Sequence, residues 1–275
     1  MLPKWMLQGL GILGMIETMS NFSNFVKSWV EQFHHEILWV TLISTVLYVV
    51  YKVTEPLKIL INLRGAGTEL NIYFGNIFSK NEKSHLAIPV NEFFDTQLAG
   101  AKGPSGDIVA PNSIHGQFIT KVYNSDSVKL DDDLNVALSG IVPNDLPRYL
   151  GKTSQYPIGT TAVIGSGKYR YLLFVLSCTD PITAKAKSDV PTMWNALEGL
   201  WTSVRNYSNG LPVALPLVGS GQSHVGLDSI NLLRLIVLSI IKSSEGQRIT
   251  SQINIVLHES VMRDVALRKI KEEFN

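Results

Sequence analysis

The sequence has a single cysteine, Cys178, so the chain can form no internal disulfide. A lone cysteine at the end of an apolar strand pattern predicts a buried, reduced thiol and fits a cytoplasmic domain. Neither sign of charge is in excess, because 24 lysines and arginines stand against 23 aspartates and glutamates. The chain also has no long block of like charge. Together these absences argue against a nucleic-acid-binding surface.

Three short motifs resemble nucleotide or metal sites but lack a feature that such sites need. Leu150-Gly151-Lys152-Thr153 resembles the end of a Walker A motif, yet Leu146 occupies the position of the first glycine, which excludes a P-loop. Asp131-Asp132-Asp133 are consecutive on a predicted helix and cannot converge on one ion, which favours a solvated surface. His34-His35 is explained by interfacial polarity. We therefore predict no metal site.

A long uncharged apolar run occupies residues 37–51, which read ILWVTLISTVLYVVY. As a helix it would cover somewhat less than the ~30 Å hydrocarbon core of a bilayer. Trp39, Tyr48 and Tyr51 stand where interfacial aromatics belong. The alternative is a buried core helix or a pair of strands. The run begins too late for a cleaved signal peptide.

A weaker apolar segment, residues 5–26, precedes this run and contains several glycines. It predicts either an interfacial or re-entrant segment or a weak first span, and the residues leave both open. Basic residues follow the strong run, namely Lys52, Lys58 and Arg64, so the positive-inside rule places the C-terminal part in the cytoplasm. We therefore predict a membrane region over 1–54 and a cytoplasmic domain over 55–275.

The chain beyond the membrane region alternates between strand and helix patterns. Its roughly 220 residues contain no internal repeat and suffice for one sizeable domain. The pattern predicts an α/β domain with a largely parallel or mixed sheet and a ligand crevice at the carboxyl ends of the strands. A last charged helix is expected to be capped by Ser260. The expected strands are 57–63, 69–74, 86–90, 160–164, 168–177, 212–218 and 253–257, and the expected helices are 113–123, 127–138, 189–207 and 227–242.

The strand 212–218 leads into the small-residue loop 219–226, and an apolar helix pattern follows at once. Small residues let a backbone close around a ligand, and the N–H groups of such a loop and of the next helix converge on a point that suits a phosphate. The alternative is a tight strand-to-helix connection that needs glycine and binds nothing.

Several of these residues resemble the motifs of macro domains. Leu215-Pro216-Leu217-Val218-Gly219-Ser220-Gly221 is similar to their second phosphate loop, and Phe74-Gly75-Asn76-Ile77 to their early Gly-Asp-Ile motif. The strand and trailing asparagine Leu86–Asn91 also resemble theirs. Membrane segments ahead of such a domain resemble the effector subunit of type II Thoeris antiphage defence. This likeness implies a three-layer α/β/α macro fold with a mixed sheet, preceded by a transmembrane helix or helical hairpin.

The resemblance implies a pocket for ADP-ribose derivatives. Two residues depart from the family: Asn76 replaces an aspartate, and Phe94 falls where many hydrolytic members carry a second asparagine. His115 and His224 could bond a diphosphate, although for each one alone we favour a loop histidine facing water. The implied ligand-binding residues are Asn76 and Ile77 near the adenine; Ser113, Ile114, His115 and Gly116 as an opposing loop; Gly219, Ser220, Gly221, Gln222 and Ser223 around the phosphates; and Asn91 and His224.

The resemblance also implies a function. The chain would be a sensor in the bacterial inner membrane rather than an enzyme, with no cofactor. Its signal would be the histidine conjugate of ADP-ribose, made by a TIR-domain partner. Binding would oligomerise the protein, disrupt membrane lipid and abort the infection. Two rivals are a membrane-tethered ADP-ribosyl hydrolase, with Asn91 positioning water, and a scaffold whose pocket is vestigial.

Overall fold

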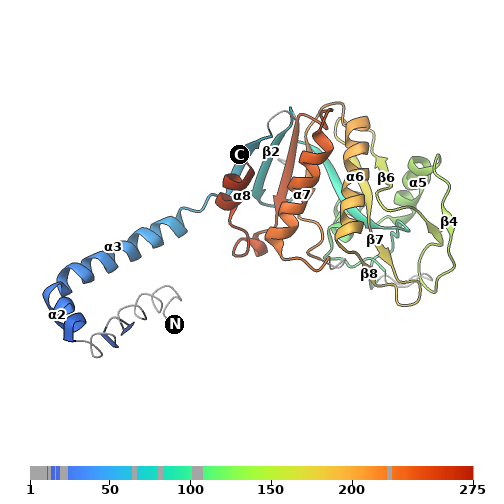
Figure 1. The fold of residues 1–275 in the computed structure, drawn as a ribbon. Coiled ribbons are helices and arrows are strands. Elements are labelled where there is room, and N and C mark those ends of the chain that lie inside the picture. The colour runs from blue at the N-terminus through green and yellow to red at the C-terminus, as the bar shows by residue number, and fades with distance from the viewer. Residues whose placement is uncertain are drawn as a thin grey trace. The chain divides into compact units, whose positions relative to one another are not determined.

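The computed structural model of the chain describes residues 24–63, 67–79, 83–100, 108–221 and 225–274, together with Gly11, Gly14, Met15, Glu17 and Thr18. The chain divides into two compact units, residues 1–55 and residues 56–275. Figure 1 shows both, and each is described by itself below.

The N-terminal unit contains helix α2 (Asn24–Gln32) and helix α3 (His34–Val53). The 20 residues of α3 extend the predicted apolar run at both ends, and at 1.5 Å per residue they reach about 30 Å. Among the described residues, the segment from His34 to Tyr51 is the one helix long and apolar enough to cross a membrane, judged by length and composition alone. Most of the weaker apolar segment 5–26 lies outside the described residues.

The second unit is built on a mixed sheet. Strands β2, β10, β9, β3 and β7 run parallel, and the edge strands β1 and β6 pair antiparallel with β2 and β7. The predicted mixed sheet is confirmed. The strands are β1 (Lys58–Asn62), β2 (Glu69–Phe74), β3 (His85–Asn91), β6 (Thr161–Ile164), β7 (Tyr171–Thr179), β9 (Val213–Pro216) and β10 (Gln252–Leu257). The short β8 (Ala186–Lys187) pairs with β7, and β4 (Asn144–Asp145) pairs with β5 (Ser154–Gln155).

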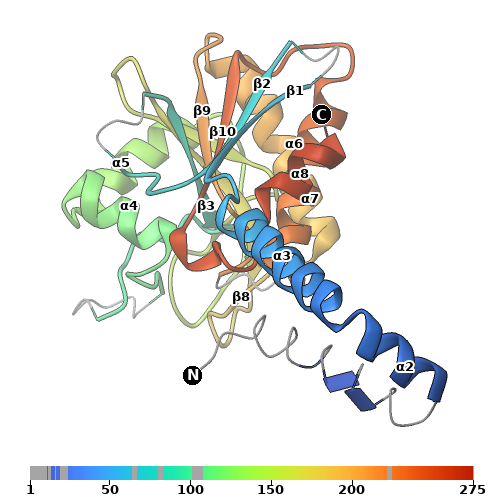
Figure 2. The same cartoon turned by 90° about the vertical axis from the view of Figure 1, so that its left-hand side faces the viewer.

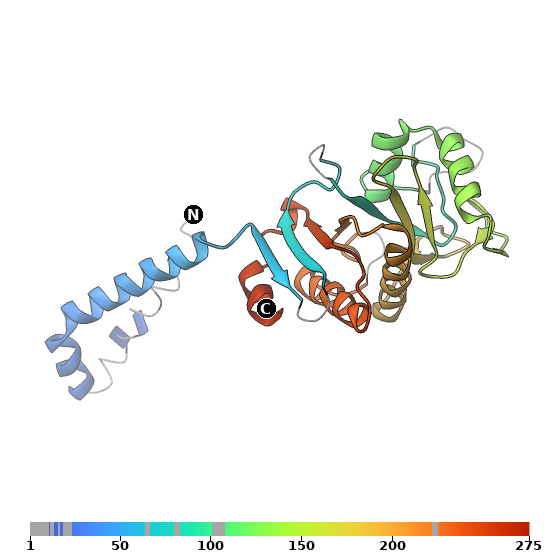
Figure 3. The ribbon, with the colours of Figure 1, turned by 90° about the horizontal axis from the view of Figure 1, so that it is seen from above.

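Helices cover both faces of this sheet, which makes three layers (Figures 2 and 3). Helices α6 (Val190–Tyr207), α7 (Ser229–Ser244) and α8 (Leu267–Phe274) lie on one face, and α4 (Ile114–Tyr123) and α5 (Ser127–Leu138) lie on the other. The expected helices 113–123, 127–138, 189–207 and 227–242 are confirmed to within two residues at each end. Helix α7 is a core helix, as predicted, and its Arg234 reaches Glu273 of α8 at 2.9 Å.

The side-chain alternation explains this layering. Residues such as Ile61, Ile72 and Ile255 point to the α6–α8 face and are fully buried. On the opposite face, Ile88 and Leu173 are buried beneath α4 and α5, whereas β1, β2 and β10 carry many polar side chains there. We call this polar part of the sheet the open face. It consists of Lys58, Leu60, Asn62, Glu69, Asn71, Tyr73, Gln252 and Asn254.

Two expectations about this unit are wrong. Cys178 is free as predicted but exposed, because the strand alternation of β7 buries Ser177 and Thr179 and turns the residue between them outward. Ser260 does not cap the last helix; it lies in a 3₁₀ turn (Glu259–Val261), and α8 begins at Leu267. Val265 and Leu267 are both buried, and a continuous helix would turn residues two apart to different faces.

Candidate functional site

The carboxyl ends of the five parallel strands lie along one side of the sheet, which we call the carboxyl edge. Gly75 follows β2, Asn91 ends β3 and Gly219 lies three residues beyond the end of β9. The edge is tied together by its backbone, since the Gly75 N–H donates to the Leu257 carbonyl at 2.8 Å. Three predicted motifs, far apart in the sequence, therefore share this edge.

Helix α4 begins at the carboxyl edge. Its N-cap is Ser113, whose Oγ accepts from the Gly116 N–H at 3.0 Å and donates to the Ala110 carbonyl at 2.7 Å. Ile114 packs against the small buried cluster that contains Ile77, which follows β2. The N-terminal end of a helix, with its free N–H groups and positive dipole end, thus faces the edge where an anion would bind.

The predicted opposing loop is partly wrong, because Ile114, His115 and Gly116 form the first turn of α4. Gly116 has a packing role there. A β-carbon at this position would stand 2.2 Å from the Ala110 carbonyl oxygen and 2.8 Å from the Pro111 α-carbon, both backbone atoms. The glycine allows the preceding loop to pass close under the helix, which is a structural need independent of any ligand.

His115 is not a loop histidine facing water, as we had favoured, but a buried helical residue with 7% of its surface exposed. Its Nε2 atom has no hydrogen-bond partner. Burial, and secondarily the charge of Lys152, lower the pKa of this imidazole from 6.5 to about 3. The ring is therefore neutral at physiological pH and supplies no positive charge to a diphosphate.

This pKa predicts an acid sensitivity of folding. Between pH 6.5 and 3 the unfolded chain binds a proton that the folded chain refuses, so stability falls as the pH falls. From pH 7 to pH 5 we expect His115 to cost about 2 kcal/mol of unfolding free energy. Urea titrations at both pH values measure this cost. Between pH 7 and pH 5, the unfolding free energy of His115→Leu should fall by about 2 kcal/mol less than that of wild type. An equal loss in both proteins would mean that the ring is protonated when folded.

The loop after β9 is closed at its base. Gly219 is buried with φ at +90°, and a β-carbon there would meet Leu232 at 2.8 Å and Val225 at 3.0 Å. The Val225 N–H donates to the Gly219 carbonyl at 3.2 Å. Ser220 and Gly221 are exposed, whereas Gln222, Ser223 and His224 lie outside the described residues. The loop thus needs glycine at 219 for its own conformation and presents Ser220 and Gly221 outward.

The other motif residues differ in how exposed they are. Asn76 is exposed, and its Oδ1 accepts from the Phe78 N–H at 2.9 Å, which forms a local turn. Ile77 is buried against Ala214 of β9 and Val256 of β10. Ile77 therefore anchors this turn in the core, while Asn76 remains at the surface.

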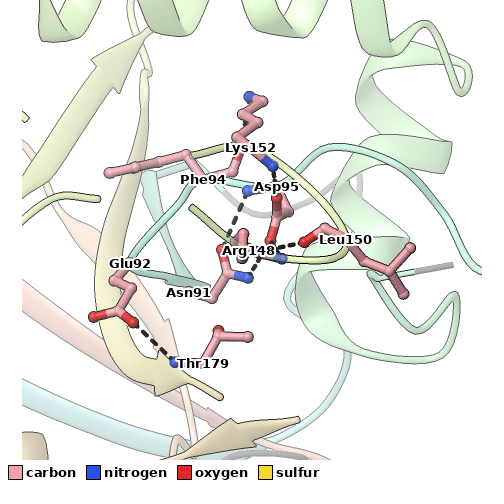
Figure 4. Close-up of polar contacts among 8 residues, drawn as sticks. All are labelled: Asn91, Glu92, Phe94, Asp95, Arg148, Leu150, Lys152 and Thr179. Carbon is pink, nitrogen blue, oxygen red and sulfur yellow. Dashed lines mark hydrogen bonds and ion pairs between the residues drawn. The ribbon is translucent and has the colours of Figure 1, made fainter. Parts of the chain in front are cut away.

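A polar cluster lies at the end of β3 (Figure 4), and the side chains of its Asp95 and Arg148 are buried. We call Asn91, Asp95, Arg148 and Lys152 the Asp95 cluster. The Asn91 amide is held at both ends: its Nδ2 donates to Asp95 Oδ2 at 2.7 Å, and its Oδ1 accepts from the Asp95 N–H at 3.1 Å. Arg148 Nη2 donates to the same Oδ2 at 2.8 Å, and the Lys152 N–H donates to Oδ1 at 3.0 Å. The Asn91 side chain is thereby committed to Asp95.

Arg148 is fully buried, with its guanidinium 4.1 Å from the centre of the Phe93 ring and its Nε donating to the Leu150 carbonyl. Lys152 Nζ donates to the Phe94 carbonyl at 2.7 Å and also contacts Asp131 at 2.5 Å. The segment 148–152 is thus fixed against the turn that follows β3. Sequence reasoning missed this cluster, because Asp95 and Arg148 are 53 residues apart.

Two of the three consecutive aspartates, Asp131 and Asp133, form hydrogen bonds within the domain. The solvent-exposed position that we predicted for all three therefore holds for Asp132. Asp131 accepts from Thr96 Oγ1 at 2.8 Å, and Asp133 accepts from the Tyr123 hydroxyl at 2.6 Å. Among the described residues, no group of three histidine, cysteine, aspartate or glutamate side chains is placed to hold a metal ion. What the carboxyl edge offers is N–H groups and hydroxyls, which suit an anion.

Comparison with known proteins identifies the family. The sequence model described as "Thoeris protein ThsA, Macro domain" matches residues 70–258, which contain the five parallel strands except for Glu69, the first residue of β2. The chain belongs to the ThsA macro-domain family. Thoeris protein ThsA of Bacillus amyloliquefaciens is 25% identical over 220 residues, which cover 77% of this chain and 70% of that relative.

Solved macrodomains share the fold of the ThsA-type domain. The Oceanobacillus iheyensis macrodomain with ADP superposes with a TM-score of 0.50 at 13% identity, covering 78% of this chain and 97% of that one. A mutant of the same macrodomain with ADPR gives a TM-score of 0.50 at 13% identity, covering 79% and 97%. The predicted three-layer macro fold is therefore confirmed.

One departure from the motifs now has a structural setting. Phe94, at the position where we expected an asparagine in hydrolytic members, has φ at +48°, in the left-handed region that large side chains seldom adopt. Its ring is 1% exposed and packs edge-on against Tyr156, with centroids 5.4 Å apart. In this ThsA-family chain the position is therefore filled by an apolar core residue.

Proposed function

We propose that this chain is a membrane-anchored Thoeris effector whose macro domain senses an ADP-ribose-derived signal at the carboxyl edge. The signal that we favour is the histidine conjugate of ADP-ribose, made by a TIR-domain partner. Binding would assemble several copies, disrupt the inner membrane and abort the infection. Membership of the ThsA macro-domain family is the observation that carries this proposal.

The carboxyl edge supports the ligand class. It brings together the glycine loop after β9, the N-terminal end of α4 and the turn at Asn76 and Ile77. In open α/β sheets, ligands bind outside the carboxyl ends of the strands. The related fold has been solved with ADP and with ADPR. We place the phosphates near Ser220 and Gly221 and the adenine near Ile77.

Helix α3 supports the membrane anchor. Its apolar side chains are exposed, for instance Trp39 at 62% and Leu47 at 63%. Its hydroxyls are satisfied within the helix: Thr41, Ser44 and Thr45 each donate to the carbonyl four residues earlier, at 2.6 to 2.8 Å. A spanning helix must satisfy its polar groups internally in this way, because lipid offers no partners.

The Asn91 amide supports binding rather than turnover. The hydrolase alternative would use Asn91 to position a water molecule, but both ends of this amide are bonded to Asp95. Phe94 brings an apolar ring where a second polar side chain would be needed. We therefore propose a sensor that leaves its ligand intact.

The proposal is tested by calorimetric titration of the full chain in lipid nanodiscs with ADP-ribose and with its histidine conjugate. We expect the conjugate to bind more tightly, and both ligands to be recovered unchanged by chromatography afterwards. Release of free ADP-ribose or histidine would instead support the hydrolase. If neither ligand produces heat or thermal stabilisation, the carboxyl edge does not bind ADP-ribose derivatives and the proposal is wrong.

A further inference from the structure

The open face carries a groove of about 520 Å³, which extends from Tyr73 and Phe74, the last two residues of β2, across to β10. Its lining includes Asn71 of β2 and Gln252 and Asn254 of β10, which stand side by side in the strand register. Lys83 and Pro212 complete its rim, and they precede β3 and β9. The groove therefore reaches the amino ends of these strands, whereas Asn91 and the Gly219 loop lie at their carboxyl ends.

The floor of the groove presents a buried amide oxygen that lacks a donor. Asn71 is 5% exposed, and its Oδ1 has no hydrogen-bond partner. Its Nδ2 donates to Asn254 Oδ1 at 3.2 Å, and Gln252 Nε2 donates to the same oxygen at 2.6 Å. Turning the Asn71 amide over would bring two oxygens together, so its orientation is set. Since no described residue supplies a donor to this buried acceptor, it suits an N–H or O–H group from a ligand.

The rim supplies positive charge above this acceptor. Lys58 and Lys83 both line the groove and are exposed, and neither forms an ion pair with any residue in the described part of the chain. Lysine ammonium groups bind phosphate as point charges. A matching ligand therefore combines an anionic group for the lysines with a donor for Asn71.

One residue of the groove, Lys58, is close in sequence to the end of α3. Lys58 is five residues beyond Val53, where α3 ends, and five extended residues span at most about 18 Å. If α3 crosses a bilayer, Lys58 is within reach of the head-group layer, which is several ångströms deep on each side. Anionic head groups attract basic residues that directly follow a membrane helix.

We propose that the groove over β2 and β10 binds a phosphate ester that also carries a hydroxyl or ammonium group. This is the chemistry of a phospholipid head group and of a soluble glycerophosphate. The site goes beyond the signal-binding function, because none of its lining residues is among those expected to bind the signal. Occupancy by a head group would dock the domain on the membrane next to the helix that anchors it.

The test uses the full chain in nanodiscs of phosphatidylcholine, titrated with glycerol 3-phosphate and separately with inorganic phosphate. We expect glycerol 3-phosphate to bind more tightly, because only the ester brings a hydroxyl for Asn71. The double variant Lys58→Gln and Lys83→Gln should bind about a hundredfold more weakly, a factor of about ten for each charged contact. The matched control is Lys129→Gln with Lys187→Gln, two exposed lysines elsewhere, which should bind as wild type does.

Nanodiscs that contain phosphatidylglycerol show whether the natural ligand is a lipid head group or a soluble glycerophosphate. If the lipid is the ligand, its head group occupies the groove, and glycerol 3-phosphate binds more weakly than in phosphatidylcholine discs. If the ligand is soluble, its affinity is the same in both discs. Either result supports the site. Three results would overturn the proposed site. They are inorganic phosphate binding as tightly as glycerol 3-phosphate, the Lys129 and Lys187 control variant losing as much affinity as the Lys58 and Lys83 variant, and no binding of either probe.

Discussion

Replacing Asp95 with asparagine is expected to lower the free energy of unfolding by about 3–5 kcal/mol, the cost of leaving a buried charge without its partner. Arg148 and Asp95 form an ion pair at 2.8 Å with side chains 0% and 1% exposed. The Nη1 atom of Arg148 has no hydrogen-bond partner among the described residues, so without Asp95 the guanidinium would keep only the Leu150 carbonyl and the Phe93 ring. Chemical denaturation of the full chain, followed by near-ultraviolet circular dichroism, measures the loss.

A surface pair provides the matched control for this experiment. Arg234 and Glu273 lie at the same separation, 2.9 Å, but their side chains are 33% and 41% exposed. Glu273→Gln should therefore cost less than about 1 kcal/mol. Removing both charges, with Asp95→Asn and Arg148→Met, should recover part of the loss, because no unpaired charge then remains buried. A loss below about 1 kcal/mol in Asp95→Asn alone would contradict the burial of this pair.

The sequence predicts the scaffold well because local patterns determine it. Apolar residues at every second position of β10 and at helical spacing in α6 pack into the same core, and the strand and the helix cover the residues over which these patterns run. The glycine turn between β6 and β7 joins an antiparallel pair, as expected. Trp201, expected on the core stripe of α6, is fully buried and donates its Nε1 hydrogen to Ser239.

The parts that sequence reasoning misplaced depend on contacts between distant segments. His115 is buried in the first turn of α4, where the loop at Ala110 and Pro111 passes close to Gly116, and only this glycine hints at the close packing. Asp95 finds Arg148 across 53 residues, and Gly151, noted only as part of a Walker-like motif, has φ at +90° where a β-carbon would strike Asp95. Such contacts join single residues of two distant segments. They therefore produce no repeating pattern in the sequence from which they could be predicted.

The second large effect is expected at the exposed end of the loop after β9, where Gly221→Glu should weaken binding of the ADP-ribose signal at least about a hundredfold. No atom of the described residues lies within 4 Å of the position that a β-carbon would take at Gly221, and the φ angle of Gly221 is not in the left-handed region. The change should therefore leave stability within about 0.5 kcal/mol of wild type. Gly219 is unsuitable for this test, because a side chain there would disturb the fold itself.

The expected loss follows from charge. If the phosphates sit against Ser220 and Gly221, a carboxylate about 4 Å away repels them by about 4 kcal/mol near a protein surface, and about 2.7 kcal/mol suffices for a hundredfold loss. Gly221→Gln has the same size without the charge and should bind better than Gly221→Glu. Gly140→Glu adds the same charge at another open, exposed glycine and should bind as wild type does. The affinities of the three variants for the histidine conjugate are measured by calorimetry. If Gly221→Glu binds the conjugate as tightly as wild type does, the phosphates do not bind at this loop.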